Sequence, residues 1–256
     1  MIPVERRRAI IRVLTRDGSA AINDLAEQLG VSHMTVRRDI GFLEGEGRVV
    51  SVSGGVALPA RLALDQPHAD KALLRPEAKA AIARYAAGLV GPGALVYLDA
   101  GTTTLAIARE LADRTDLSFV TNDLMIAVFL SERSTAPLYL AAGSVDRANL
   151  STEGALVAGA IAQYNIDVAF MSTSSFDLRG LSVPSGEKRI VKEAIVANAT
   201  TTYLATDSSK YGRVAALRAT PLSRLDGVIT DSGLSDSAKE SLLDRGISLH
   251  IVDPSA

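Results

Sequence analysis

Apolar residues recur at helical spacing near the start of the chain and give way to strand-like runs further on. Residues 6–14 and 22–29 each carry an apolar stripe that ends near a glycine, which predicts two short helices. A third stripe is formed by Val36, Ile40 and Leu43. The β-branched residues on either side of Ser53-Gly54-Gly55 predict a hairpin, because glycine permits a tight turn. Three helices followed by a hairpin are the order of a winged helix-turn-helix.

The third helix presents a short cationic face. Ser32 is placed to cap it, since the serine hydroxyl can accept a backbone N–H bond from the first turn. The buried stripe leaves Met34 and Arg38 on the opposite face, flanked by Thr35 and Arg37. Arginine makes bidentate contacts to guanine, and the first turn of such a helix lies nearest the base edges. Paired arginines alone are more often a solvated helix face, but the whole ordered set favours DNA binding.

We therefore predict that residues of this segment contact double-stranded operator DNA. They are Arg6, Ser32, His33, Met34, Thr35, Arg37, Arg38, Arg48, Ser51 and Ser53. The first 58 residues hold eight arginines against seven acidic residues, so the positive excess is small. The DNA affinity of a weakly basic domain depends on paired binding sites more than on total charge. We therefore expect a homo-oligomer, either a dimer or a tetramer.

The pattern changes after residues 59–75, which contain two prolines and show no clean period. Beyond them helices are expected at 77–90, 104–113, 124–132, 153–164 and 187–198, and strands at 94–98, 117–121, 138–141, 167–171, 202–206, 227–230 and 248–252. Strands that alternate with helices indicate a mostly parallel sheet covered on both faces. We predict a winged helix-turn-helix domain at 1–58, a linker at 59–75 and an α/β domain at 76–256.

Composition excludes several classes of function. The chain has no cysteine, so disulfides, thiolate metal sites and thiol catalysis are excluded, and its three scattered histidines have no zinc spacing. We expect neither a metal nor a cofactor. The N-terminus lacks the apolar run of a signal peptide, and no apolar stretch is long enough to span a membrane. We therefore expect a cytoplasmic protein that does not bind membranes.

Three loops at expected strand ends carry side chains suited to a ligand, which in such sheets binds where strands end and helices begin. Asp99 to Thr104 joins a glycine and three threonines to a helix start, where free N–H groups and the helix dipole favour an anion. Asn122 follows the next strand and suits a polyol, while residues 207–212 offer a carboxylate, two hydroxyls and an ammonium group. Taken singly, each loop also has an ordinary explanation as a helix cap or a surface loop.

The two halves together resemble the DeoR family of bacterial transcription regulators. The family's N-terminal signature, GVSxxTxRRDxxxLExxGxxxxxxGG, is matched from Gly30 to Gly55. Its sensor motifs (S/A)GTTT, TN, VKxA and DSSK(F/Y)G are matched at residues 100–104, 121–122, 191–194 and 207–212. The resemblance implies a sensor fold similar to sugar-phosphate isomerases and CoA transferases, with an effector that is usually a phosphorylated sugar or a related metabolite.

Matching positions assign residues to that effector. The resemblance places Gly101, Thr102, Thr103 and Thr104 around the phosphate, Lys192 and Lys210 as its neutralising charges, and Asn122 and Asp207 against hydroxyls. Asp99 in the first loop and Ser172 complete the predicted set.

The chain departs from the family pattern in three places. Residues 171–177 carry a run of serine and threonine, and residues 182–187 replace the usual TTPNE, so we expect an effector other than the family's commonest one. Ser51 and Ser53 stand where the family usually has arginine and histidine, which predicts a weaker grip of the wing on phosphate.

We predict a sequence-specific transcription regulator, a repressor of a carbohydrate catabolic operon that is controlled by a phosphorylated sugar or sugar acid. The main alternative is a sugar-phosphate isomerase-like enzyme with an appended DNA-binding module. Isomerisation needs a general base beside the substrate carbon, and no histidine lies near the three loops. Only Asp99, Asp177, Glu187 and Asp207 could serve, and related isomerases place acidic residues where this chain has Ser-Thr-Ser-Ser. We therefore predict no enzymatic activity.

Overall fold

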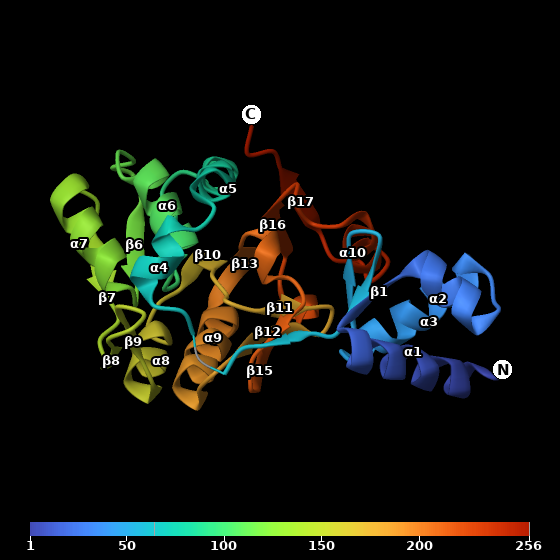
Figure 1. Cartoon of the computed structure of the whole chain (residues 1–256). Coiled ribbons are helices and arrows are strands. Elements are labelled where there is room, and N and C mark those ends of the chain that lie inside the picture. Colours follow the sequence, from blue (N-terminus) through green and yellow to red (C-terminus); the bar gives the residue numbers. More distant parts are fainter. Residues whose placement is uncertain (64, 256) are drawn as a thin grey trace.

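The N-terminal part of the chain is a winged helix-turn-helix that projects from one end of an α/β domain (Figure 1). The computed structural model describes residues 1–63 and 65–255. Leu64, in the predicted linker, and Ala256, in the predicted α/β domain, lie outside the described residues. The N-terminal helices are α1 (Pro3–Asp17), α2 (Ile22–Leu29) and α3 (His33–Gly45). Their apolar stripes meet in one core, which includes Ile10, Leu25, Val36 and Leu43.

The wing is a small antiparallel sheet. The predicted hairpin consists of β2 (Val50–Val52) and β3 (Gly55–Ala57), and β1 (Ser19–Ala21) adds a third strand to β3 that the sequence did not predict. Gly54 turns the hairpin with a φ of 73°, in the left-handed region that glycine adopts without strain. The three strands close the wing against the helices, because Val56 of β3 is buried in the same core.

The predicted linker is folded onto the α/β domain. It contains β4 (Ala60–Arg61) and α4 (His68–Leu73), and β4 pairs in parallel with β14 (Arg213–Val214). The N–H of Ala60 donates to Gly212 O at 3.1 Å, and the N–H of His68 donates to Ala148 O at 2.8 Å. The predicted linker is thus hydrogen-bonded to the α/β domain at residues 60 and 68.

The α/β domain is built on a seven-stranded sheet in which every neighbouring pair is parallel. In spatial order the strands are β17 (Leu249–Val252), β16 (Gly227–Asp231), β13 (Ala199–Ala205), β10 (Ile166–Met171), β5 (Leu95–Leu98), β6 (Ser118–Thr121) and β7 (Leu138–Leu140). Parallel strands need crossover connections, and helices supply most of them. The predicted fold class, a winged helix-turn-helix followed by an α/β domain with a mostly parallel sheet, is confirmed.

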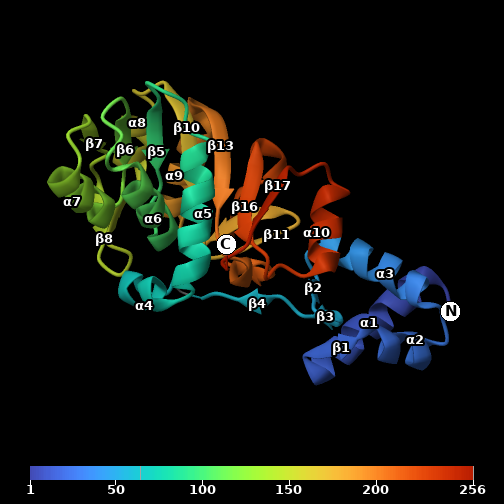
Figure 2. The ribbon, with the colours of Figure 1, turned by 90° about the horizontal axis from the view of Figure 1, so that it is seen from above.

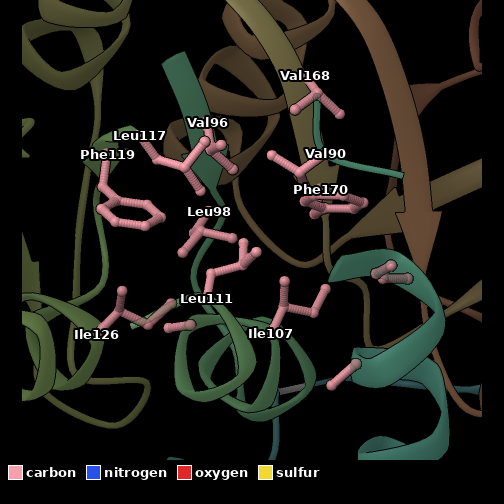
Figure 3. Close-up of a cluster of buried hydrophobic side chains, with 14 of the residues drawn as sticks. Val90, Val96, Leu98, Ile107, Leu111, Leu117, Phe119, Ile126, Val168 and Phe170 are labelled. Carbon is pink, nitrogen blue, oxygen red and sulfur yellow. The ribbon is translucent and has the colours of Figure 1, made fainter. Parts of the chain in front are cut away.

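Helices cover both faces of the sheet. One face packs against α5 (Pro76–Gly88), α6 (Thr102–Leu111) and α7 (Leu124–Arg133), as Figure 2 shows. The other face packs against α8 (Ala155–Ile161), α9 (Gly186–Asn198) and α10 (Asp236–Leu243). Figure 3 shows the first core, where Val96 and Leu98 of β5 lie near Ile107 and Leu111 of α6. Tyr97 between them points into the second core, as the two-residue period of a strand requires.

Short antiparallel strand pairs lie outside the seven-stranded sheet. A hairpin of β8 (Ser144–Asp146) and β9 (Ser151–Glu153) precedes α8, so the helix predicted from residue 153 is shorter than expected. A second small sheet joins β11 (Phe176–Asp177), β12 (Gly180–Val183) and β15 (Leu217–Thr220). The short 3₁₀ helices η1 (Ser208–Lys210) and η2 (Leu222–Arg224) complete the elements. Within residues 1–63 and 65–255, none of the helices has the length and apolar character required to cross a membrane.

Candidate functional site

The outer face of α3 is the candidate DNA interface. Helix α3 begins as predicted, because Ser32 Oγ accepts the N–H of Thr35 at 3.3 Å. His33, Met34, Arg37 and Arg38 are all exposed on the first two turns. Neither Arg37 nor Arg38 forms an ion pair or a side-chain hydrogen bond in the described part of the chain. Both guanidinium groups can therefore meet a phosphate or a base edge.

Two residues predicted to contact DNA are buried instead. Arg6 donates to Asp39 in a buried ion pair that ties α1 to α3. Ser51 donates from its N–H to Glu44 Oε1 and from its Oγ to Oε2, both at 2.8 Å. Arg6 and Ser51 hold the domain together, so we remove them from the predicted interface. Ser53 at the wing tip and Arg48 are exposed, and they stay predictions together with Ser32, His33, Met34, Thr35, Arg37 and Arg38.

A cavity at the carboxyl ends of β5, β6, β10 and β13 brings together nine of the ten residues predicted to bind the effector. These are Asp99, Gly101, Thr102, Thr103, Asn122, Ser172, Lys192, Asp207 and Lys210. Thr104 does not line it: the residue is fully buried, and its Oγ1 donates to Asp99 O and Gly101 O at 2.6 and 2.8 Å. Thr104 therefore closes the turn from inside, which corrects its predicted role as a phosphate ligand.

The start of α6 forms one part of the cavity wall. The helix begins at Thr102, two residues earlier than predicted, and its cap residue Gly101 offers no side chain to its first N–H groups. The hydroxyls of Thr102 and Thr103 make no hydrogen bond to any residue that the structure describes. A Cβ at Gly101 would lie 2.8 Å from Ser172 Oγ and 2.9 Å from its Cβ, so the close approach of these loops requires glycine. Uncapped N–H groups beside two hydroxyls suit an anion.

Five lysines line the same cavity, namely Lys71, Lys79, Lys188, Lys192 and Lys210. Lys192 is paired with Asp99 and also donates to Ser172 O at 2.7 Å. Lys79 and Lys210 have no carboxylate within ion-pair distance among the described residues, although both are buried. Burial lowers the pKa of Lys210 and brings that of Lys79 to about 8. The Lys79 ammonium donates one hydrogen bond to Lys71 O, so it keeps N–H donors for a ligand, as does the Lys210 ammonium.

Several predicted ligand residues are occupied by internal bonds. Asn122 accepts from Tyr97 OH at 2.9 Å and donates to Thr152 O at 2.8 Å. Asp99 accepts the N–H groups of Ala100 and Ser172 as well as the Lys192 ammonium. Asp207 accepts the N–H of Ser209 at 3.1 Å. These side chains shape the cavity, whereas Thr102, Thr103 and Lys210 have free polar atoms.

Other polar residues of the cavity were not predicted from the sequence, among them Asp65, Lys71, Lys79, Glu153 and Lys188. One signal for Lys79 was present, because it occupies the apolar stripe of its helix, four residues before Ala83. The others lie on an irregular segment, in the six-residue helix α4, at the end of β9 and in the first turn of α9, and these pieces are too short for a hydrophobic period to be informative. Glu153 Oε2 is buried without a hydrogen-bond partner, and burial raises the pKa of this carboxyl.

One cavity loop reaches the DNA-binding domain. Tyr211 follows Lys210, and its hydroxyl donates to Glu44 Oε1 at 3.0 Å. Glu44 lies near the end of α3 and also holds Ser51 of the wing. The next residue, Gly212, packs so tightly on Val50 that an added Cβ would lie 2.3 Å from its Cγ2. The loop that carries the Lys210 ammonium therefore touches both α3 and the wing.

Comparison with known proteins gives matches over nearly the whole chain. The DeoR-like helix-turn-helix domain matches residues 6–61, and the DeoR C terminal sensor domain matches residues 74–232. An uncharacterized HTH-type transcriptional regulator of Haemophilus influenzae is 43% identical over 98% of both chains. The uncharacterized HTH-type transcriptional regulator YgbI of Escherichia coli is 45% identical over 97% of this chain and 98% of its own. The glycerol-3-phosphate regulon repressor of Escherichia coli is 30% identical over 98% of this chain and all of its own.

Solved structures match more distantly. A ribose 5-phosphate isomerase a from Methanocaldococcus jannaschii aligns with a TM-score of 0.37 and 19% identity, over 52% of this chain and 53% of the isomerase. No group of three or more histidine and acidic side chains placed to hold a metal ion occurs within the described ranges. The sequence matches decide the family. The chain belongs to the DeoR family of helix-turn-helix transcription regulators, and this membership confirms the prediction that it is a regulator and not an enzyme.

Proposed function

We propose that this chain is a cytoplasmic repressor of a carbohydrate catabolic operon whose affinity for operator DNA is set by a phosphorylated sugar or sugar acid in the cavity. One observation carries the proposal: the buried ammonium groups of Lys79 and Lys210 lack a carboxylate partner in a cavity that also contains an uncapped helix start. A buried charge without a partner is costly, so an anion would stabilise this arrangement. One relative, the glycerol-3-phosphate regulon repressor, is named for a phosphorylated polyol.

The contact at Glu44 supports allosteric control. An anion that binds Lys210 would shift η1, and this shift would move Tyr211, because Tyr211 directly follows Lys210. Tyr211 and Ser51 share the Glu44 carboxylate, so a shift of the loop changes how α3 and the wing are held together. A coupling free energy of ~1–3 kcal/mol would change the affinity for DNA about five-fold to 150-fold.

Arg38→Ala tests the DNA half of the proposal. Because Arg38 is exposed on α3 without a partner among the described residues, we expect specific affinity to fall by ~1–3 kcal/mol if it contacts a base. Fluorescence anisotropy with a duplex selected from a random library by the full chain measures this loss. Arg133→Ala is the matched control, because Arg133 is exposed at the end of α7, the helix far from the DNA-binding domain in Figure 1. An equal loss on random DNA would make Arg38 a phosphate contact, and no loss would remove it from the interface.

Strand β7 is an edge of the sheet (Figure 1), and we propose that the oligomer forms there. Exposed apolar side chains gather on the elements around it: Val128 on α7, Tyr139 on β7, Val145 on β8 and Leu156 on α8. A contiguous apolar patch marks a protein interface, and we propose that these side chains contribute to one. We expect Val145→Asp with Leu156→Lys to yield a smaller species in sedimentation velocity, whereas Leu243→Lys on α10 should leave the mass unchanged. An unaltered mass in the double variant would place the interface elsewhere.

The charge of Lys79 makes effector binding depend on pH. Its pKa is lowered by burial to about 8 in the ligand-free protein, so the ammonium loses its proton as the pH rises from 7 to 9. A bound anion favours the protonated form, and binding above pH 8 must therefore take up a proton. We expect the affinity for a phosphorylated ligand to fall by about ten-fold between pH 7 and pH 9, since a phosphate monoester is already doubly charged over this range.

Isothermal titration of the full chain between pH 7 and pH 9 measures how the ligand affinity depends on pH. Lys79→Met should bind the same ligand more weakly, with little dependence on pH between 7 and 9. A wild-type affinity that is constant over the range, or a slope that persists in Lys79→Met, would contradict this role of Lys79.

A further inference from the structure

A carboxylate of the chain itself occupies part of the cavity. Asp65 lies on the linker segment between β4 and α4, and it lines the same cavity as Lys210 and the start of α6. Its Oδ2 accepts from Lys71 Nζ at 3.3 Å and from Lys188 Nζ at 3.1 Å, and its Oδ1 accepts from Ser174 Oγ. The side chain is only 12% exposed. The linker is therefore anchored inside the predicted sensor.

The donors that hold Asp65 form a carboxylate site. They come from α4, from the start of α9 and from the serine-threonine run at residues 172–175, and all three point to one carboxylate. Burial alone would raise the pKa of Asp65, but the charges of Lys71 and Lys188 outweigh it, so the pKa lies below its usual range. Lys188 also pairs with Asp146 at 2.8 Å, whereas Asp65 is the one carboxylate that pairs with Lys71 among the described residues.

The position of Asp65 links the cavity to the wing. Asp65 follows β4 by four residues, and β4 follows the wing strand β3 by three. The N–H groups of Ala60 and Leu62 donate to Gly212 O and Val214 O, which continue the loop of Lys210 and Tyr211. Withdrawal of Asp65 would loosen the segment that enters the DNA-binding domain directly.

We propose that Asp65 is a tethered competitor for an effector that carries a carboxylate as well as a phosphate, and that the effector's carboxylate replaces it on Lys71, Lys188 and Ser174. This inference rests on the proposed function, because the phosphate would occupy the part of the cavity formed by α6 and Lys210. A neutral alcohol cannot replace Asp65 in this way, since Lys71 would be left buried without a counter-charge. Once Asp65 is displaced, the linker is free to move, and the contacts that position the wing change.

The test uses probes that differ only in the carboxylate. Matched pairs of three to six carbons run from 3-phosphoglycerate against glycerol 3-phosphate to 6-phosphogluconate against sorbitol 6-phosphate, with inorganic phosphate as the common part. Isothermal titration is done with the full chain as wild type, as Asp65→Asn and as Asp70→Asn. Asp70 is an exposed acidic residue of α4 and serves as the matched control.

We expect the wild type to bind the acid of at least one pair about ten-fold more tightly than its alcohol. Asp65→Asn should bind that acid several-fold more tightly still, because a state that competes with the ligand is removed, and Asp70→Asn should match the wild type. DNA affinity of ligand-free Asp65→Asn should move toward that of the wild type saturated with the acid.

Equal affinity of the wild type for acid and alcohol would overturn the inference and leave the proposed function standing. Weaker binding of both probes by Asp65→Asn would also overturn it, because Asp65 would then be a ligand contact and not a competitor. If no phosphorylated probe and no inorganic phosphate binds any of the three proteins, the proposed function fails as well. The comparison of acid and alcohol affinities in the wild type needs no variant, so it tests the inference even where Asp65→Asn fails to fold.

Discussion

Asp39→Ala lowers the free energy of unfolding of the winged helix-turn-helix by ~3–5 kcal/mol, the loss expected when one partner of a buried ion pair is removed. Asp39 and Arg6 are 6% and 7% exposed at their side chains, and their contact joins α3 to α1. Without the carboxylate, the Arg6 guanidinium is left buried with one remaining hydrogen bond among the described residues, to Met1 O at 3.3 Å. Asp39 directly follows Arg37 and Arg38, so the loss also misplaces the residues proposed to contact DNA.

Urea unfolding followed by circular dichroism measures this loss on the full chain. Asp17→Ala removes an exposed pair with Arg16 on the same helix and should have little effect, because solvent screens such pairs. The double variant Arg6→Met, Asp39→Leu should recover most of the stability, since an apolar pair can replace a buried ion pair. An Asp39→Ala protein as stable as the Asp17→Ala control would show that this pair does not hold α1 to α3.

Lys210→Met should weaken binding of a phosphorylated effector at least about 30-fold, because truncating a buried charge partner typically costs about 2–5 kcal/mol. Lys210 is buried at the cavity wall, and its ammonium group has no hydrogen-bond or ion-pair partner in the ranges that the structure describes. Its removal therefore leaves no internal carboxylate unpaired, and DNA binding without effector should be unchanged.

Titration of the wild type and Lys210→Met with the probes defined above measures the loss. Lys239→Met on α10, whose ammonium pairs with Asp236 at the surface, controls for loss of a lysine at a distance from the cavity. Undiminished affinity of Lys210→Met for every probe that binds the wild type would remove Lys210 from the effector site.

Local patterns predicted the elements that are defined by neighbouring residues. The capped helix α3, the Gly54 turn and the alternating strands and helices beyond residue 76 each depend on spacing within one segment, and the structure contains all of them. The cavity could be anticipated for the same reason, because Asp99, Asn122 and Asp207 all follow strands whose carboxyl ends meet at one edge of a parallel sheet.

What the sequence could not predict depends on pairing between distant segments. β1, β4 and β14 have two or three residues each, and they are strands only because a partner from elsewhere lies beside them. Arg6 and Ser51 looked like DNA contacts because nothing local shows that Asp39 and Glu44 hold them inside. The role of Asp65 was hidden for the same reason, since its partner Lys188 lies 123 residues away.

The measurement that tests the account most directly is the DNA affinity of the full chain with and without phosphorylated ligands. Anisotropy with the library-selected duplex is recorded against the phosphorylated acids and alcohols, and against the unphosphorylated counterpart of each as a control. We predict that at least one phosphorylated ligand changes the dissociation constant for DNA about five-fold or more, that its unphosphorylated counterpart does not, and that Lys210→Met abolishes the change. Specific DNA binding that is indifferent to every phosphorylated ligand would contradict the claim that the cavity controls the DNA-binding domain.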